Sequence, residues 1–104
     1  MLTIVAEVCT HPGQQHRDAV LALFREVMPA VLNEPGCYGY TPMLDSRAGL
    51  DFQSTNPDSV MMIEKWQDLA ALQAHREAPH MVEFHRRANA HISGIRVRIL
   101  EDAA

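Results

Sequence analysis

Residues 60–85, "VMMIEKWQDLAALQAHREAPHMVEFH", combine the signals of a strand, a helix start and a helix break. Its first seven residues, 60–66, are mostly apolar and predict a strand. Asp68 follows as a candidate N-cap, because an aspartate oxygen can accept a hydrogen bond from a backbone N–H of the first helical turn. We therefore expect a short helix that runs from Asp68 to about His75.

A proline-marked break divides the helical part of this stretch. Residues 76–79, "REAP", end the first helix. Pro79 suits the first turn of a second helix, because proline lacks an N–H and an N–H in that turn has no acceptor within the helix. The second helix is expected to reach about His91. Residues 94–100, "GIRVRIL", then alternate between apolar residues and arginines, which predicts a strand. One face of that strand carries Ile95, Val97 and Ile99, and the other carries Arg96 and Arg98.

The N-terminal part of the chain predicts two more strands around a long helix. Apolar and β-branched residues fill 2–9, and the turn signal "HPG" follows at 11–13. Apolar residues then recur at steps of three and four over 15–33, which is typical of an amphipathic helix. Pro29 lies inside that helix and is expected to kink it. Residues 37–44, "CYGYTPML", predict the next strand.

Two details of this strand follow from its residues. Pro42 has no N–H to give to a neighbouring strand, so we expect the strand at an edge of the sheet. Tyr38 and Tyr40 are two residues apart and are expected to share one face. Residues 45–59 then predict an irregular connection to the strand at 60–66.

The order of elements is βαββαβ, which predicts a ferredoxin-like α+β fold with an antiparallel sheet and helices on one face. At 104 residues, the chain is expected to form one domain, residues 1–104. The first and second strands are not neighbours in this topology, so a disulfide between Cys9 and Cys37 is not expected. Apolar residues occupy both faces of the strands, as Ile4 and Val5 illustrate. Because helices cover only one face, we expect a second copy on the other, in a homodimer.

Composition argues against several kinds of partner and location. The net charge is −4 and the pI about 5.8, with scattered basic residues, so neither nucleic acid nor an anionic membrane surface is an expected partner. No apolar run approaches the roughly 20 residues that cross a bilayer. The N-terminal "MLTIVAEVC" lacks the marks of a signal peptide, and two cysteines are too few for a disulfide framework. We therefore expect a cytoplasmic protein.

Several landmarks, taken in order, resemble the antibiotic biosynthesis monooxygenase family. They are "AEV…HPG" at 6–13, "NEPGCYGY" at 33–40, "IEKWQDLAALQAH" at 63–75 and "PHMVEF" at 79–84. The resemblance implies that two ferredoxin-like protomers join their sheets in a dimeric α/β-barrel, with a substrate cavity between sheet and helices in each. It also implies a cofactor-independent quinol monooxygenase, which oxidises a menadiol-like hydroquinone to the quinone with O₂ and needs no metal or flavin.

The same family contains other activities, which stay open as alternatives. An isomerase of a small phosphorylated metabolite would need phosphate-binding groups, for which Arg47, Arg76 or Arg96 are available. A quinone-binding dimer without catalysis is a second alternative. Haem-degrading members use an asparagine on the first strand, a tryptophan near the end of the first short helix and an axial histidine. Here His85 falls at about the axial position, whereas His75 stands where that tryptophan would be.

His75, His80 and His85 are each five residues apart, which argues against a metal site. Five helical residues turn through roughly 500°, so these side chains point in different directions, unlike the i, i+4 pairs of helical metal sites. A quinol is a far stronger reductant once it has lost a proton, and histidine is the residue type suited to remove it near pH 7. His75 and His80 flank the break at Pro79, so they are our candidates for the catalytic base. The alternative is that they cap helix ends.

Other residues are candidates for substrate binding. Trp66 either belongs to the core or forms a flat wall for an aromatic ring. Tyr40 either donates a hydrogen bond to a quinone oxygen or fills the sheet face. Glu64 shares the face of Trp66, where it either pairs with Arg96 or Arg98 of the partner sheet or acts as a base. Further candidates for an adaptable apolar pocket are Met61, Met62, Phe52 and Phe84.

Overall fold

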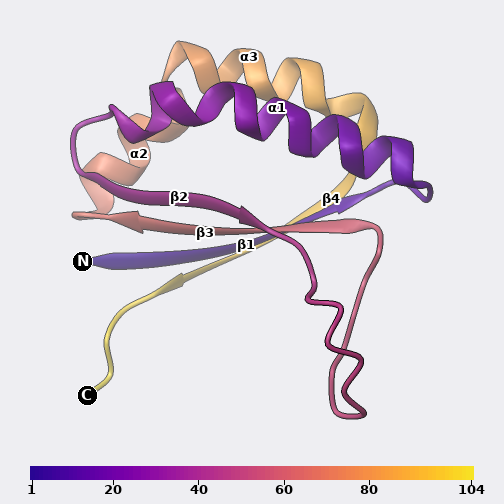
Figure 1. The fold of residues 1–104 in the computed structure, drawn as a ribbon. Coiled ribbons are helices and arrows are strands. Elements are labelled where there is room, and N and C mark those ends of the chain that lie inside the picture. Colours follow the sequence, from indigo (N-terminus) through magenta and orange to yellow (C-terminus); the bar gives the residue numbers. More distant parts are fainter.

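A computed structural model describes residues 1–104 and has two layers, with helices on one side of a four-stranded sheet (Figure 1). The elements follow in the order β1 (Leu2–Thr10), α1 (Gln14–Leu32), β2 (Cys37–Met43), β3 (Ser59–Trp66), α2 (Leu69–Glu77), α3 (Pro79–Ala88), a 3₁₀ turn η1 (Asn89–His91) and β4 (Ile92–Leu100). The connection between β2 and β3 projects away from the helices, on the opposite side of the sheet (Figure 1).

The strands form one antiparallel sheet in the order β2-β3-β1-β4. This is the ferredoxin-like arrangement, so the predicted fold class is confirmed. β2 lies at an edge, as Pro42 predicts. β3 separates β1 from β2, and Cys9 and Cys37 are both free.

Local signals at the helix ends act as predicted. The Asp68 side chain caps α2 by accepting a hydrogen bond from the backbone N–H of Ala71 at 2.9 Å. Pro79 opens α3, directly after the extended Ala78. α3 ends at Ala88, earlier than the predicted limit at His91, because the backbone tightens into η1 before β4 begins. None of the helices is both long and apolar enough to span a membrane.

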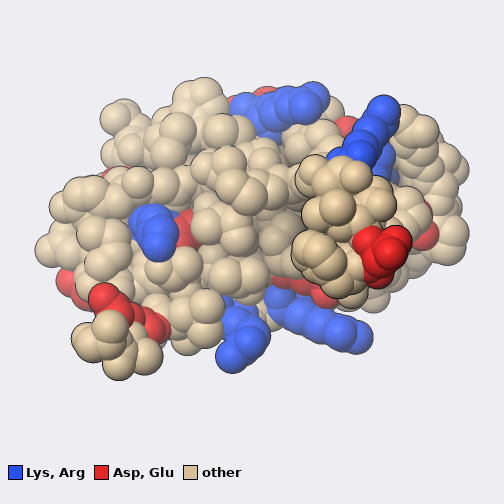
Figure 2. All heavy atoms as spheres, turned by 60° about the horizontal axis from the view of Figure 1, so that its bottom comes forward, with Lys and Arg blue, Asp and Glu red and all other residues tan.

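The sheet has one buried face and one open face. Alternate residues of β1 pack under the helices, where Ile4 is 2% and Val8 3% exposed, while Val5 and Glu7 lie half-buried on the other side. Figure 2 turns the open side of the sheet forward and shows a largely uncharged surface there, with charged groups mainly toward its margins. The core under the helices consists of 17 residues: Leu2, Ile4, Ala6, Val8, Val20, Leu21, Phe24, Val27, Val31, Tyr40, Val60, Met62, Trp66, Leu72, Met81, Phe84 and Ala88.

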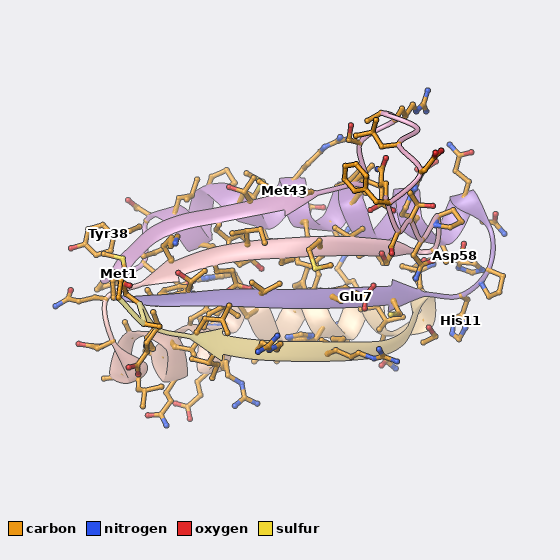
Figure 3. All side chains as sticks on the ribbon, turned by 90° about the horizontal axis from the view of Figure 1, so that it is seen from below. Met1, Glu7, His11, Tyr38, Met43 and Asp58 are labelled. Atoms are coloured by element: carbon orange, nitrogen blue, oxygen red, sulfur yellow. The ribbon has the colours of Figure 1, made fainter.

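The prediction that Tyr38 and Tyr40 share a face is wrong. Tyr40 is 2% exposed in the core, whereas Tyr38 is 64% exposed. A β-bulge causes the difference, because Cys37 pairs with Trp66 and Gly39 with Lys65, which leaves Tyr38 as an extra residue. Figure 3 shows Tyr38 at the margin of the sheet, where β2 begins.

Candidate active site

A largely apolar cavity of about 610 Å³ lies between the sheet and helices α2 and α3, which is within the usual range for small-molecule sites. It exists because the helices leave part of β4 uncovered. Ile95, Val97 and Ile99 pair with buried residues of β1 and face the helix side, yet each is about half exposed. The apolar lining comprises Ile4, Ala6, Val8, Phe24, Tyr40, Met62, Leu69, Leu72, Met81, Phe84, Ile92, Ile95, Val97 and Ile99.

Glu64 places a carboxyl group in this apolar lining. It is 7% exposed, and its Oε1 accepts a hydrogen bond from Trp66 Nε1 at 2.9 Å. Burial raises the pKa of Glu64, while the Trp66 hydrogen bond and the nearby His75 act in the opposite direction. Its second oxygen, Oε2, has no hydrogen-bond partner in the chain and is free to meet a ligand.

His75, in the last turn of α2, lines the same cavity and is held from behind. Its Nδ1 lies 2.9 Å from Glu34 Oε2, and its ring packs on Trp66 with 4.5 Å between the ring centroids. With Glu34 as the acceptor, Nδ1 carries the hydrogen of the neutral imidazole. Nε2 then has a free lone pair and no partner in the chain. His75 is therefore oriented as a base or hydrogen-bonding group toward a bound molecule.

Tyr40 adds a hydroxyl group to the otherwise apolar part of the lining. Its ring contacts His75 edge-on at 5.5 Å between centroids, and its hydroxyl makes no hydrogen bond within the chain. Burial, followed by the charges of Glu64 and Glu34, raises the pKa of Tyr40 well above its usual value. The phenol thus stays protonated and can donate a hydrogen bond to a ligand oxygen.

Glu34 is a site residue that sequence reasoning missed. It lies in the loop after α1 and is mostly buried, with Oε2 bridging His75 Nδ1 at 2.9 Å and His80 Nε2 at 2.8 Å. These partners are 41 and 46 residues away along the chain, so no local spacing indicates the contact. The only sequence signal was the family landmark at 33–40, which contains Glu34 but does not assign it a partner.

The cavity rim on the helix side is polar. Gln73, Arg76 and His85 contribute to the lining there. Partial burial, with smaller contributions from His75 and Arg76, lowers the pKa of His85 and so favours the neutral imidazole. His85 is thus a cavity residue, although it was not among the residues predicted to bind substrate or act as the base.

The predicted site residues divide into two groups. The structure brings His75, Tyr40, Glu64, Met62 and Phe84 together around the cavity. It does not bring the following four residues to the cavity lining: Trp66, His80, Phe52 and Met61.

Each of these four lies away from the cavity for its own reason. Met61 pairs with Glu7 on the open side of the sheet. Trp66 has no exposed surface and lies behind Glu64 and His75, as a core residue that supports both. His80 lies on the other side of Glu34. Phe52 is 87% exposed on the projecting connection between β2 and β3.

The predicted pairing of Glu64 with Arg96 or Arg98 of the partner sheet is wrong, because Glu64 faces the helices and not the open side of the sheet. Register places Glu64 opposite Ile4, on the helix side, whereas Arg96 and Arg98 lie opposite Glu7 and Val5, on the open side. The sheet therefore separates the carboxylate from both arginines. No group of three or more histidine, cysteine, aspartate or glutamate side chains is arranged to hold a metal ion.

A second hollow, about 710 Å³, lies between the two ends of the chain and the start of α2. It is lined by Asp68, Glu101 and Asp102 among others and contains no histidine or buried polar group. Asp68 already serves as the α2 cap. The cavity with Glu64, His75 and Tyr40 is therefore the better candidate for chemistry.

Comparisons with known proteins identify the family. Residues 1–87 match the profile of the family described as antibiotic biosynthesis monooxygenase. The chain belongs to the antibiotic biosynthesis monooxygenase family. It is 48% identical over 101 residues to a protein named "Probable quinol monooxygenase YgiN" from Escherichia coli strain K12, with 97% of each chain covered. The predicted family is confirmed, and with it the expectation of an enzyme.

Solved structures agree with this assignment. A crystal structure of an antibiotic biosynthesis monooxygenase superposes with a TM-score of 0.81 at 28% identity and covers 100% of both chains. PA3566 from Pseudomonas aeruginosa gives a TM-score of 0.81 at 27% identity, covering 99% of this chain and 94% of its own. The family fold is thus shared over essentially the full length of the chain.

Proposed function

We propose that this family member oxidises a hydroquinone of menadiol type with O₂, and that it does so without a cofactor. The single observation that carries this proposal is the state of His75. Its Nδ1 is engaged by Glu34, and its Nε2 is left unpaired at an apolar cavity of a size suited to a one- or two-ring aromatic molecule. The name of the YgiN relative supports the same substrate class.

His75 is the base in this mechanism. The quinol O–H bond breaks, its proton binds His75 Nε2, and the electron pair stays on the quinolate oxygen. The Glu34 carboxylate stabilises the imidazolium that forms, since it already accepts the hydrogen bond from Nδ1. The electron-rich quinolate then transfers electrons to O₂. One quinol and one O₂ give either quinone and H₂O₂ or hydroxylated quinone and water.

Tyr40 and Glu64 position the aromatic ring in this proposal. The Tyr40 phenol donates a hydrogen bond to a quinol or quinone oxygen, and the free oxygen of Glu64 meets another polar group of the ligand. The remaining contacts are apolar, from residues such as Met62 and Phe84. Their exclusion of water confines reactive oxygen species and strengthens the few polar interactions.

A test begins with reduced menadione under anaerobic conditions, followed by a pulse of ¹⁸O₂. We expect quinol loss well above the protein-free rate, and mass spectrometry separates oxygenation from oxidation to the quinone. His75→Gln should lower kcat by about 10²–10⁴-fold, which is the usual contribution of a general base. His11→Gln is the matched control. His11 follows the C-terminal end of β1 (Figure 3), whereas Trp66, which packs on His75, pairs with Leu2 at the start of β1.

Other outcomes point to the alternatives. Quinol loss no faster than without protein would overturn the proposal, and binding without turnover would favour a quinone-binding dimer. A Soret band after haem addition would support the haem alternative. An isomerase of a phosphorylated metabolite is less suited to this cavity, whose lining contains Arg76 as its one arginine and no lysine.

We further propose that the working unit is a homodimer formed through the open face of the sheet. Met43 and Glu7 lie on that side (Figure 3), and the connection beside it carries the exposed Leu50 and Phe52. The face presents Glu7 directly opposite Arg96, so it carries both charge signs. A two-fold interface must be complementary to itself, and a largely uncharged face that carries both signs meets that requirement.

Light scattering after size exclusion tests the dimer. Val5→Glu, on the open face, should shift the mass from two chains to one. Val82→Glu is the control, because Val82 is 59% exposed on α3 in the helix layer. A monomeric wild-type protein, or a dimer unaffected by Val5→Glu, contradicts this proposal.

A further inference from the structure

Two histidines contact one carboxylate oxygen of Glu34, and the second of them, His80, has no role in the proposed reaction. His75 Nδ1 lies 2.9 Å and His80 Nε2 lies 2.8 Å from Glu34 Oε2. The side chains become steadily more accessible along this path, from 6% at His75 to 11% at Glu34 and 30% at His80. Only the first of the three lines the cavity.

We propose that Glu34 and His80 are the route by which His75 exchanges protons with solvent. The inference rests on the proposed function, in which a proton arrives on His75 from the quinol. An aromatic molecule that fills the cavity covers the cavity side of His75, and the protein covers nearly all of the rest. The hydrogen-bonded path through Glu34 is then the way out that the geometry offers.

Each transfer along this path moves one proton and no electrons. The Nδ1–H bond of the His75 imidazolium breaks and an O–H bond forms on Glu34. That bond breaks in turn as Nε2 of His80, in the neutral tautomer that carries its hydrogen on Nδ1, takes the proton, and Nδ1 then passes its own proton to water or buffer. The same path in reverse returns a proton to the site, where reduced oxygen needs it. The overall reaction of quinol with O₂ therefore remains balanced, with no net proton consumed.

The fold holds the three groups from three separate segments. Glu34 is fixed by its own N–H, which donates to Val31 O at 3.0 Å, and by its carbonyl, which accepts from Cys37 N at 3.2 Å. His75 and His80 are joined across the helix break, where Ala78 N donates to His75 O at 3.2 Å. The break at Pro79 thus serves to aim both imidazoles at one oxygen.

A purely structural role predicts something different from a proton route. If Glu34 only ties the helix junction to the loop, replacing His80 should lower stability and affect activity only through unfolding. If His80 is the outlet, its replacement should create a dependence on external buffer, because a small base can substitute for the missing imidazole. His80→Gln suits the comparison, since the amide can still donate a hydrogen bond to Glu34 but cannot relay a proton.

The experiment measures kcat for menadiol oxidation at increasing imidazole concentration and constant ionic strength. Wild type and His11→Gln should show no dependence. For His80→Gln, kcat should be at least about tenfold lower in dilute, non-imidazole buffer. It should rise to a plateau as imidazole is added, while KM and thermal stability stay near wild type. His80→Gln turnover equal to wild type in dilute buffer, or a loss that imidazole does not restore, overturns the proposal.

A second measurement works even if the quinol is not a substrate, and so separates the failure of this inference from that of the proposed function. Nitrogen-15 NMR with menadione bound follows exchange of the His75 ring N–H with water. The route predicts fast exchange in wild type and slower exchange in His80→Gln, restored by imidazole. Equal exchange rates in the two proteins would refute it.

Discussion

Replacing Trp66 with phenylalanine tests whether its indole supports the site from behind. The side chain has no exposed surface, and its Nε1 is the one hydrogen-bond donor to Glu64 within the chain. Leaving a buried acceptor unsatisfied costs about 1–3 kcal/mol. The smaller ring also leaves a void. Complete truncation of Trp or Phe to Ala costs about 3–5 kcal/mol, so we assign about 1 kcal/mol of lost stability to this smaller change. We expect a loss of about 2–4 kcal/mol in the free energy of unfolding.

Urea denaturation at fixed protein concentration measures this loss, and a double-mutant cycle with Glu64→Leu isolates the hydrogen bond. Contacting residues typically show coupling of about 0.5–3 kcal/mol, and here at least about 1 kcal/mol is expected. Because the Trp66 hydrogen bond lowers the pKa of Glu64, Trp66→Phe should also raise that pKa further. Additive losses with no coupling would show that the indole contributes only packing, which refutes the reasoning.

Two other perturbations test the energetics of the fold. Burial raises the pKa of Glu64, so the folded state holds this proton more tightly than the unfolded state, and wild type loses stability as pH rises through the unfolded and then the folded pKa. Glu64→Gln should therefore gain stability relative to wild type as pH rises from about 4 to about 8 in thermal denaturation, and a pH-independent difference would contradict the assignment. Gly36→Ala should cost about 1–3 kcal/mol, because φ is +81° and the new Cβ would lie 2.7 Å from Ala71 Cβ. Gly94→Ala, with open space around it and no positive φ, is the control and should change stability by less than about 0.5 kcal/mol.

Local chemistry explains why some site residues were predictable. Glu64 and Trp66 share a face because they alternate on one strand, and His75 ends a helix whose start Asp68 marks. The resemblance to the family added the expectation of a cavity between sheet and helices. In contrast, the exposure of Tyr38 depends on a bulge that one residue creates in the β2–β3 pairing, and no local sequence pattern indicates that bulge.

The order of strands and helices, the helix cap at Asp68, the break at Pro79 and the edge position of β2 were predictable from the residues alone. These features depend on periodicity and backbone chemistry within a few residues. Only the tertiary structure decided that Glu34 joins His75 to His80, and that Trp66 stands behind the cavity. Such contacts depend on how α1, α2 and α3 pack over the sheet, which brings together side chains more than forty residues apart.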